Sequence, residues 1–145
     1  MLEALTGNRA LCAALMAWGV AQMIKTLIAS LHSRRFLPQM LLASGGMPSS
    51  HAALVCGLAT AIGRVTGIGS PSFAVAVVLA GIVMYDACGV RLAAGHHAQI
   101  LNRLLARDRA EPGVSSRLSE SIGHTPFEVL AGALLGIAIG MFATR

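Results

Sequence analysis

The sequence predicts an all-α protein, a polytopic membrane helical bundle of about four transmembrane helices with an amphipathic extension after the third. Of the 145 residues, 55% are hydrophobic and only 12% are charged. The apolar residues come in runs long enough to cross a bilayer. No repeat or linker divides the chain, so we expect a single integral membrane domain over residues 1–145.

The four expected spans are 10–31, 50–64, 71–90 and 126–143. The first and third are near the roughly 20 residues that a bilayer requires, and the fourth is adequate. The second is short at about 15 residues, so a re-entrant segment is the alternative there. Ser70-Pro71 and Thr125-Pro126 precede the last two spans as capping residues with proline at the first helical position.

The segment after the third span alternates apolar residues with His96, His97, Asn102 and Arg103. It either extends the third helix or lies in the membrane interface. Adjacent histidines point to different faces of a helix, and the three cysteines show no ligand spacing. We therefore expect no metal, cofactor or disulfide framework.

The basic residues predict the orientation. With four spans, both termini lie on one face, and the 32–49 and 91–125 connections lie on the other. The second face carries the larger share of arginines, namely Arg34, Arg35, Arg91, Arg103, Arg107, Arg109 and Arg117. The positive-inside tendency makes that face cytoplasmic, in a bacterial inner (plasma) membrane, although arginines kept for phosphate binding would bias the same count. No nucleic-acid motif is present, so anionic lipid is the expected partner.

Two histidines stand where apolar helices should begin. His51 follows Pro48-Ser49-Ser50, and His124 precedes Thr125-Pro126. The N-terminus of a helix attracts anions through its unpaired amides and its dipole. Helix capping alone would not require the histidines, because the start at Ser70-Pro71 has none. The two starts therefore predict a phosphate-handling site on one membrane face.

Glu128 lies one helical turn after His124, where a carboxylate can orient the imidazole and leave its other nitrogen to attack phosphorus. Alternatively, Thr125 and Glu128 form only a capping box. A second histidine could protonate the leaving alkoxide while Lys and Arg neutralise the phosphoryl oxygens, so metal is not required. The constellation suits phosphomonoester hydrolysis.

Lys25 and Asp86 are ionisable residues inside apolar runs. Such groups usually face a polar cavity, and Gln22, Lys25 and His32 would form one inward stripe. The alternative for Lys25 is snorkelling to the interface. Asp86 is either an acid or base within the site or, as we favour, a structural counter-ion for Lys25 or Arg91.

Glycines recur every four residues on the last span, at Gly132, Gly136 and Gly140. A stripe of small residues permits close helix contact. We expect it to pack within the chain, with a homodimer interface as the alternative.

These segments resemble the divergent branch of the type 2 phosphatidic acid phosphatase family, which is related to acid phosphatases and vanadium-dependent haloperoxidases. The resemblance rests on Gln22 and Lys25, Arg34-Arg35, GGMPSSH at 45–51, YDACGVRLAAGHHAQILN at 85–102 and GHTPFEV at 123–129. Against the mainstream phosphatases, Ser50 replaces a glycine and Glu128 replaces an aspartate. Lys25 and Arg34 or Arg35 stand at a longer spacing, and either Arg91 or Arg117 fills the phosphate-binding arginine position.

The resemblance implies a metal-independent phosphatase acting on a lipid phosphate or pyrophosphate. His124 would be the nucleophile that forms a phosphohistidine, His51 the general acid and Glu128 the orienting carboxylate. The implied phosphate-binding residues are Lys25, Arg34, Arg35, Ser49, Ser50, Arg91 and Arg117. The substrate would be an anionic phospholipid or a polyprenyl phosphate. A second hypothesis is a protein that binds or transports anionic lipid at the same anion site without hydrolysis, and a third is a purely structural bundle.

Overall fold

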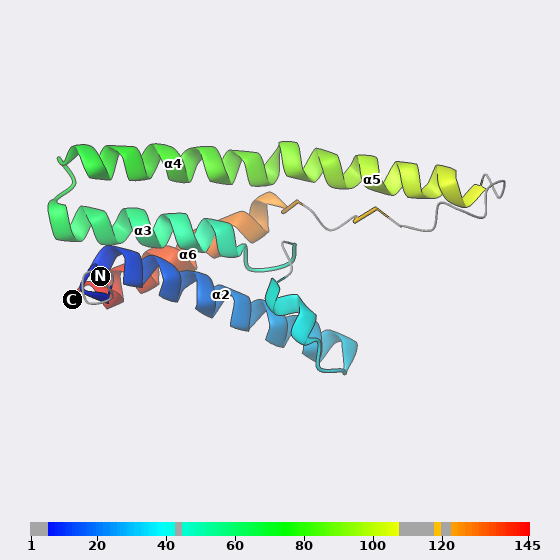
Figure 1. The fold of residues 1–145 in the computed structure, drawn as a ribbon, viewed down its shortest axis with the longest axis horizontal. Coiled ribbons are helices and arrows are strands. Elements are labelled where there is room, and N and C mark those ends of the chain that lie inside the picture. Colours follow the sequence, from blue (N-terminus) through cyan, green and yellow to red (C-terminus); the bar gives the residue numbers. More distant parts are fainter. Residues whose placement is uncertain (1–5, 43–44, 108–117, 120–122) are drawn as a thin grey trace.

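The computed structural model describes residues 6–42, 45–107, 118–119 and 123–145, and the secondary structure across them is helical. Its elements are α2 (Arg9–Ser33), the 3-10 helix η1 (Pro38–Leu42), α3 (Ser50–Thr66), α4 (Pro71–Cys88), α5 (Val90–Arg107) and α6 (Pro126–Ala143), as Figure 1 shows. The prediction of an all-α membrane bundle is confirmed.

Three helical stretches are long and apolar enough to cross a membrane, namely Arg9–Ser33, Pro71–Ala106 and Pro126–Ala143. They correspond to the first, third and fourth expected spans. The third expected span ends at Cys88 and not at residue 90, because Gly89 departs from helical geometry with φ −102° and ψ −90°.

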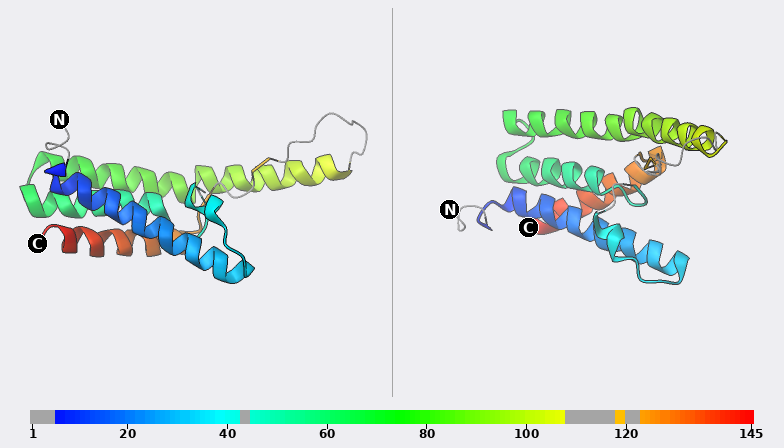
Figure 2. Two further views of the ribbon diagram at one scale, coloured as in Figure 1. Left: turned by 60° about the horizontal axis from the view of Figure 1, so that its bottom comes forward. Right: turned by 45° about the vertical axis from the view of Figure 1, so that its right-hand side comes forward.

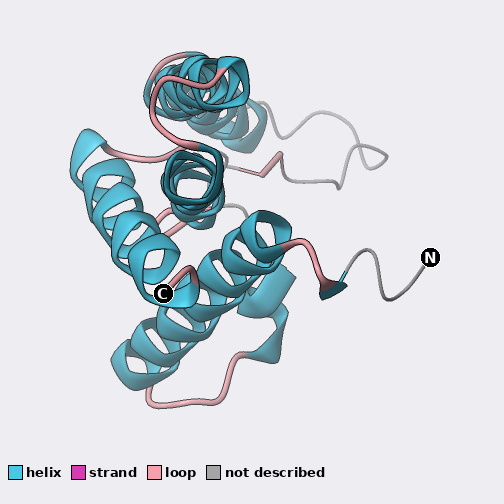
Figure 3. Cartoon of the chain, turned by 90° about the vertical axis from the view of Figure 1, so that its left-hand side faces the viewer, coloured by secondary structure: helices cyan, strands magenta, loops and turns pink. Residues whose placement is uncertain are grey.

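The second expected span, α3, is a continuous helix of 17 residues. At 1.5 Å per residue it is about 26 Å long, slightly shorter than the hydrocarbon core of a typical bilayer. It packs against α2, α4 and α6, and Figure 3 shows the other helices arranged around it. Because neighbouring helices cover it, α3 needs less apolar character than a lipid-facing span. As one continuous helix that packs beside the other spans, α3 favours the spanning prediction over the re-entrant alternative.

Glycines let α6 approach the backbone of α3 closely. A Cβ on Gly132 would lie 2.2 Å from the Ser49 carbonyl oxygen, and one on Gly136 would lie 2.3 Å from that of Ala53. Gly140 makes a similar contact farther along the helix. The stripe therefore packs within the chain, where α3 covers it.

Small residues fill the interior and large ones face outward. The buried positions of α2 are mainly alanines such as Ala13, Ala17 and Ala21, which are fully buried. Large apolar side chains are exposed on α2, α4 and α6, among them Leu15, Leu27, Val75, Leu79, Leu130 and Leu134. This distribution is typical of helices that pack through small residues and present large ones to lipid.

The α5 helix continues α4 past the end of the bundle, as Figures 1 and 2 show. Among the described helices it contacts α4 alone. The Asn102 side chain donates to the Leu118 carbonyl at 2.9 Å and accepts from the Leu118 amide at 3.0 Å, and a Cβ on Gly123 would meet the backbone of Leu92. Residues 118 and 123 thus lie along α5, on the way back to the bundle. The segment after the third span therefore extends the third helix, which is one of the two placements that the sequence allowed.

The bundle has two distinct ends. The α3–α4 turn lies at one end, where the Arg9 guanidinium donates to the Arg145 carbonyl. The other end contains the C-termini of α2 and α4 and the N-termini of α3 and α6 (Figure 2). The spans therefore alternate as expected, and the two histidine-bearing helix starts share one end.

Candidate active site

The starts of α3 and α6 are held side by side by their backbones. The Ser49 amide donates to the Glu128 carbonyl at 3.0 Å, and the Ser49 hydroxyl accepts from the Ala52 amide at 3.4 Å as the N-cap of α3. The side chain of Ser49 is completely buried. The contact is possible because Gly132 leaves no side chain between the two helices. Ser49 therefore caps and positions α3, and its expected contact with phosphate stays a prediction.

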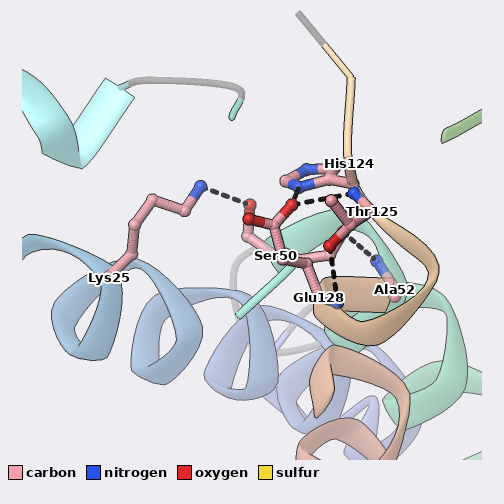
Figure 4. A network of polar contacts seen from close by, with 7 residues as sticks. Lys25, Ser50, Ala52, His124, Thr125 and Glu128 are labelled. Atoms are coloured by element: carbon pink, nitrogen blue, oxygen red, sulfur yellow. Dashed lines mark hydrogen bonds and ion pairs between the residues drawn. The ribbon is translucent and has the colours of Figure 1, made fainter. Parts of the chain in front are cut away.

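The start of α6 combines capping with the expected histidine–carboxylate pair (Figure 4). Thr125 and Glu128 form a complete capping box, in which Glu128 Oε2 accepts from the Thr125 amide at 3.0 Å. The same oxygen lies 3.3 Å from His124 Nδ1. The two interpretations of Glu128 are thus both realised, because one carboxylate oxygen serves the helix start and the imidazole.

His124 is fixed from a third side by the end of α4. Its amide donates to the Ala87 carbonyl at 3.1 Å, and its side chain is only 1% exposed. A Cβ on Gly123 would lie 2.3 Å from the Cα of Leu92, so the chain can dock here only with glycine before the histidine. Sequence reasoning missed the positioning role of Ala87 and Gly123. The available signal was the glycine, which permits close backbone approach.

His51 faces His124 across the ends of the two helices. The ring centroids are 6.4 Å apart with an interplanar angle of 63°. Lys25, Arg91 and Asp86 also interact electrostatically with His51. The structure therefore brings both histidines into one charged cluster, at a separation that one phosphoryl group could bridge.

Lys25 reaches this cluster from α2. It is 1% exposed, and its Nζ lies 3.5 Å from the hydroxyl of Ser50, which is also 1% exposed (Figure 4). The backbone of Gly46, with φ +90°, passes against the aliphatic part of the lysine. Glu128 interacts with Lys25 electrostatically. The snorkelling alternative is wrong, because the ammonium group points toward the two helix starts.

Asp86 and Arg91 form an ion pair across the α4–α5 junction, between Oδ2 and Nε. Both side chains are partly exposed, at 38% and 47%. Of the two interpretations of Asp86, the geometry agrees with the structural counter-ion, and its partner is Arg91. Of the two candidate arginines, Arg91 lies in the cluster, and Arg117 lies outside the described residues.

The structure does not bring Arg34 and Arg35 to the histidines. They follow the end of α2, nine and ten residues beyond Lys25, which corresponds to about 14–15 Å along the helix axis. Both are exposed. This placement at the far end of α2 does not support our expectation that they clamp the same phosphate as Lys25.

Other polar residues lie apart from the cluster. His32, His96 and His97 are exposed, and the Gln22 side-chain amide donates to the Leu41 carbonyl at 2.7 Å, which holds η1 against α2. Within the described part of the chain, no three His, Cys, Asp or Glu side chains are grouped as metal ligands.

Comparison with known proteins gives the family. The Divergent PAP2 family matches residues 6–139, which include both helix starts and Lys25. The chain belongs to this family. A membrane protein of Bacillus subtilis (strain 168), YuiD, described as uncharacterized, is 39% identical over 150 residues, covering 95% of this chain and 94% of its own. No solved structure matches the chain.

Membership in the Divergent PAP2 family confirms the resemblance seen in the motifs. It makes the protein a phosphatase-related membrane protein. Together with the three apolar helices, it establishes an integral membrane protein.

Proposed function

We propose that this protein is a membrane lipid-phosphate phosphatase that works through a phosphohistidine intermediate without metal. The observation that carries the proposal is the pairing of His124 with Glu128 at 3.3 Å, with His51 facing it at 6.4 Å between ring centroids. A buried imidazole whose Nδ1 meets a carboxylate is oriented for attack through Nε2. The second imidazole supplies the proton that the leaving group requires.

In the first step, His124 Nε2 attacks phosphorus and forms the P–N bond while the P–O bond to the lipid alkoxide breaks. The departing oxygen takes a proton from His51, so the lipid leaves with a free hydroxyl group, or as a lipid phosphate when the substrate is a pyrophosphate. Glu128 stabilises the positive charge that develops on the His124 ring.

In the second step, His51, now a base, removes a proton from water as the water oxygen attacks phosphorus. The P–N bond breaks, inorganic phosphate leaves, and His51 is again protonated. The same two rings therefore return to their starting state with one water molecule consumed.

Cationic groups around the histidines would hold the phosphoryl oxygens. Lys25 lies beside Ser50 at the start of α3, and Arg91 interacts with His51 from the α4–α5 junction. The amides of the first turn of α3 add a further anion site. Such groups stabilise charge that spreads over the equatorial oxygens during transfer.

A lipid substrate fits the position of these groups at one end of a membrane bundle. Large apolar side chains on α2, α4 and α6 face outward along the spans, so the acyl or prenyl chain of a substrate can remain in the bilayer. Phosphatidic acid, phosphatidylglycerophosphate and polyprenyl phosphates all present a phosphate at the membrane surface. From the excess of arginine at the same end, we place the site on the cytoplasmic face of the bacterial inner membrane.

The test is phosphate release from a panel of these lipids by detergent-purified protein in the presence of EDTA. We expect wild type to release phosphate and His124→Ala and His51→Ala to abolish release. His97→Ala is the matched control, because His97 is an exposed histidine on α5, and we expect it to retain turnover. If folded wild-type protein binds the lipids and releases no phosphate, the non-hydrolytic lipid binding or transport hypothesis replaces this proposal.

A further inference from the structure

Arg34 and Arg35, which the first helix carries away from the histidines, form a second cationic feature. They line an open groove of about 360 Å³ together with Leu27, Ser30, Leu31 and Phe36. We propose that this groove binds the headgroup of an anionic phospholipid, as a lipid site separate from the active site.

The groove lies on the opposite side of α2 from Lys25. At 3.6 residues per turn, Leu27 is about 200° and Leu31 about 240° round the helix from Lys25. Lys25 is buried in the bundle, whereas Leu27 and Leu31 are 59% and 69% exposed. A molecule in the groove would therefore approach from the surrounding lipid and would not pass through the histidine site.

The two arginines are presented by a fixed turn. Arg34 adopts the left-handed conformation, with φ 53°, and its amide donates to the Leu31 carbonyl. The Arg35 amide donates to the Ser30 carbonyl, and the Ser30 hydroxyl accepts from the Leu37 amide at 3.2 Å. These bonds satisfy carbonyls at the end of α2 that would otherwise repel an anion.

Charge and apolar surface together identify the ligand. Asp86 and Glu128 are the acidic residues in the described part of the chain, and neither forms an ion pair with Arg34 or Arg35. Phe36, 78% exposed, adds apolar surface beside the cations. Two guanidinium groups that pair with neither described carboxylate, beside exposed leucine and phenylalanine at the end of a membrane span, match a phosphodiester headgroup with its acyl chains.

The probe is phosphatidylglycerol, compared with phosphatidylcholine, titrated onto the detergent-purified full chain and read by native mass spectrometry. Phosphatidylglycerol is a phosphodiester and not a phosphomonoester, so its binding is independent of the proposed turnover. We expect wild type to prefer phosphatidylglycerol. At roughly five-fold per arginine, the double variant Arg34→Gln/Arg35→Gln should bind it about 25-fold more weakly.

The matched control is Arg103→Gln/Arg107→Gln, which removes the same net charge from α5. We expect this variant to bind within about three-fold of wild type. An equal loss in both double variants would overturn the proposal, because it would indicate attraction by net charge alone. Equal binding of the two lipids by wild type would also overturn it, as would displacement of phosphatidylglycerol by millimolar inorganic phosphate. Unchanged melting temperatures of the variants verify that they fold.

Discussion

The shared oxygen of Glu128 allows its two roles to be separated by substitution. Glu128→Gln keeps a carbonyl oxygen that can accept from the Thr125 amide, and it removes the negative charge beside His124. We therefore expect the variant to fold normally and to lose turnover. Thr125→Ala is the converse change, because it removes the cap and leaves the carboxylate in place.

The size of the effect follows from the geometry. Two unit charges 3.3 Å apart attract by about 5 kcal/mol at an effective dielectric constant of about 20. Because the Glu128 side chain is 23% exposed, we take about half of this, roughly 2.5 kcal/mol, as the stabilisation of the charged His124 ring in the transition state. That corresponds to about a 70-fold lower kcat for Glu128→Gln.

For Thr125→Ala we expect the opposite pattern, a loss of about 1 kcal/mol of stability with kcat within a few-fold of wild type. The assay is kcat on the best lipid phosphate of the panel, measured in parallel with thermal unfolding in detergent. The reasoning is refuted if Thr125→Ala loses as much turnover as Glu128→Gln, since Glu128 would then act only by shaping the start of α6.

Three further predictions concern packing and charge. Gly136→Ala should lower stability by about 1–3 kcal/mol, because the added methyl meets a carbonyl of α3. Gly81→Ala, whose added methyl meets open space, should leave stability unchanged, and thermal unfolding in detergent compares the two variants. Gly123→Ala should reduce kcat more than stability, because it displaces the backbone before His124; a variant with normal turnover would contradict this docking. Lys25→Met keeps most of the side-chain volume and removes the cation, so we expect KM to rise and kcat to fall, each by at least about ten-fold. Rescue of both constants by Lys25→Arg would show that the positive charge is what the site requires.

Much of the fold could be predicted from the sequence because the signals are local. Capping residues and proline mark where α4 and α6 begin, and long apolar runs mark the spans. The weakest expected span, residues 50–64, became the central helix α3, surrounded by other helices. A helix that faces protein does not need the apolar character of one that faces lipid, so hydropathy underestimates it.

The site was predictable where its residues share one helical turn and unpredictable where it depends on packing between helices. The spacing of His124 and Glu128 alone indicates their contact. The position of Arg34 and Arg35 relative to Lys25 could not be predicted, because the sequence does not state how far α2 continues before it turns. Likewise, the contact of His124 with the Ala87 carbonyl depends on how the return from α5 meets the end of α4, and no local pattern encodes that meeting.

The geometry of the histidine cluster is tied to assembly of the bundle. Lys25 comes from α2, His51 from α3, the Ala87 carbonyl from α4 and His124 from the start of α6. Ion pairs and charges inside membrane helices are costly unless they compensate one another, and here Lys25 interacts with Glu128 while Asp86 pairs with Arg91. The charge of the buried Lys25 is therefore compensated only when α2 and α6 are packed together, since Glu128 comes from α6. Loosening the α3–α6 contact, as in Gly136→Ala, should therefore lower both turnover and thermal stability. In Glu128→Gln, by contrast, turnover should fall while thermal stability is kept.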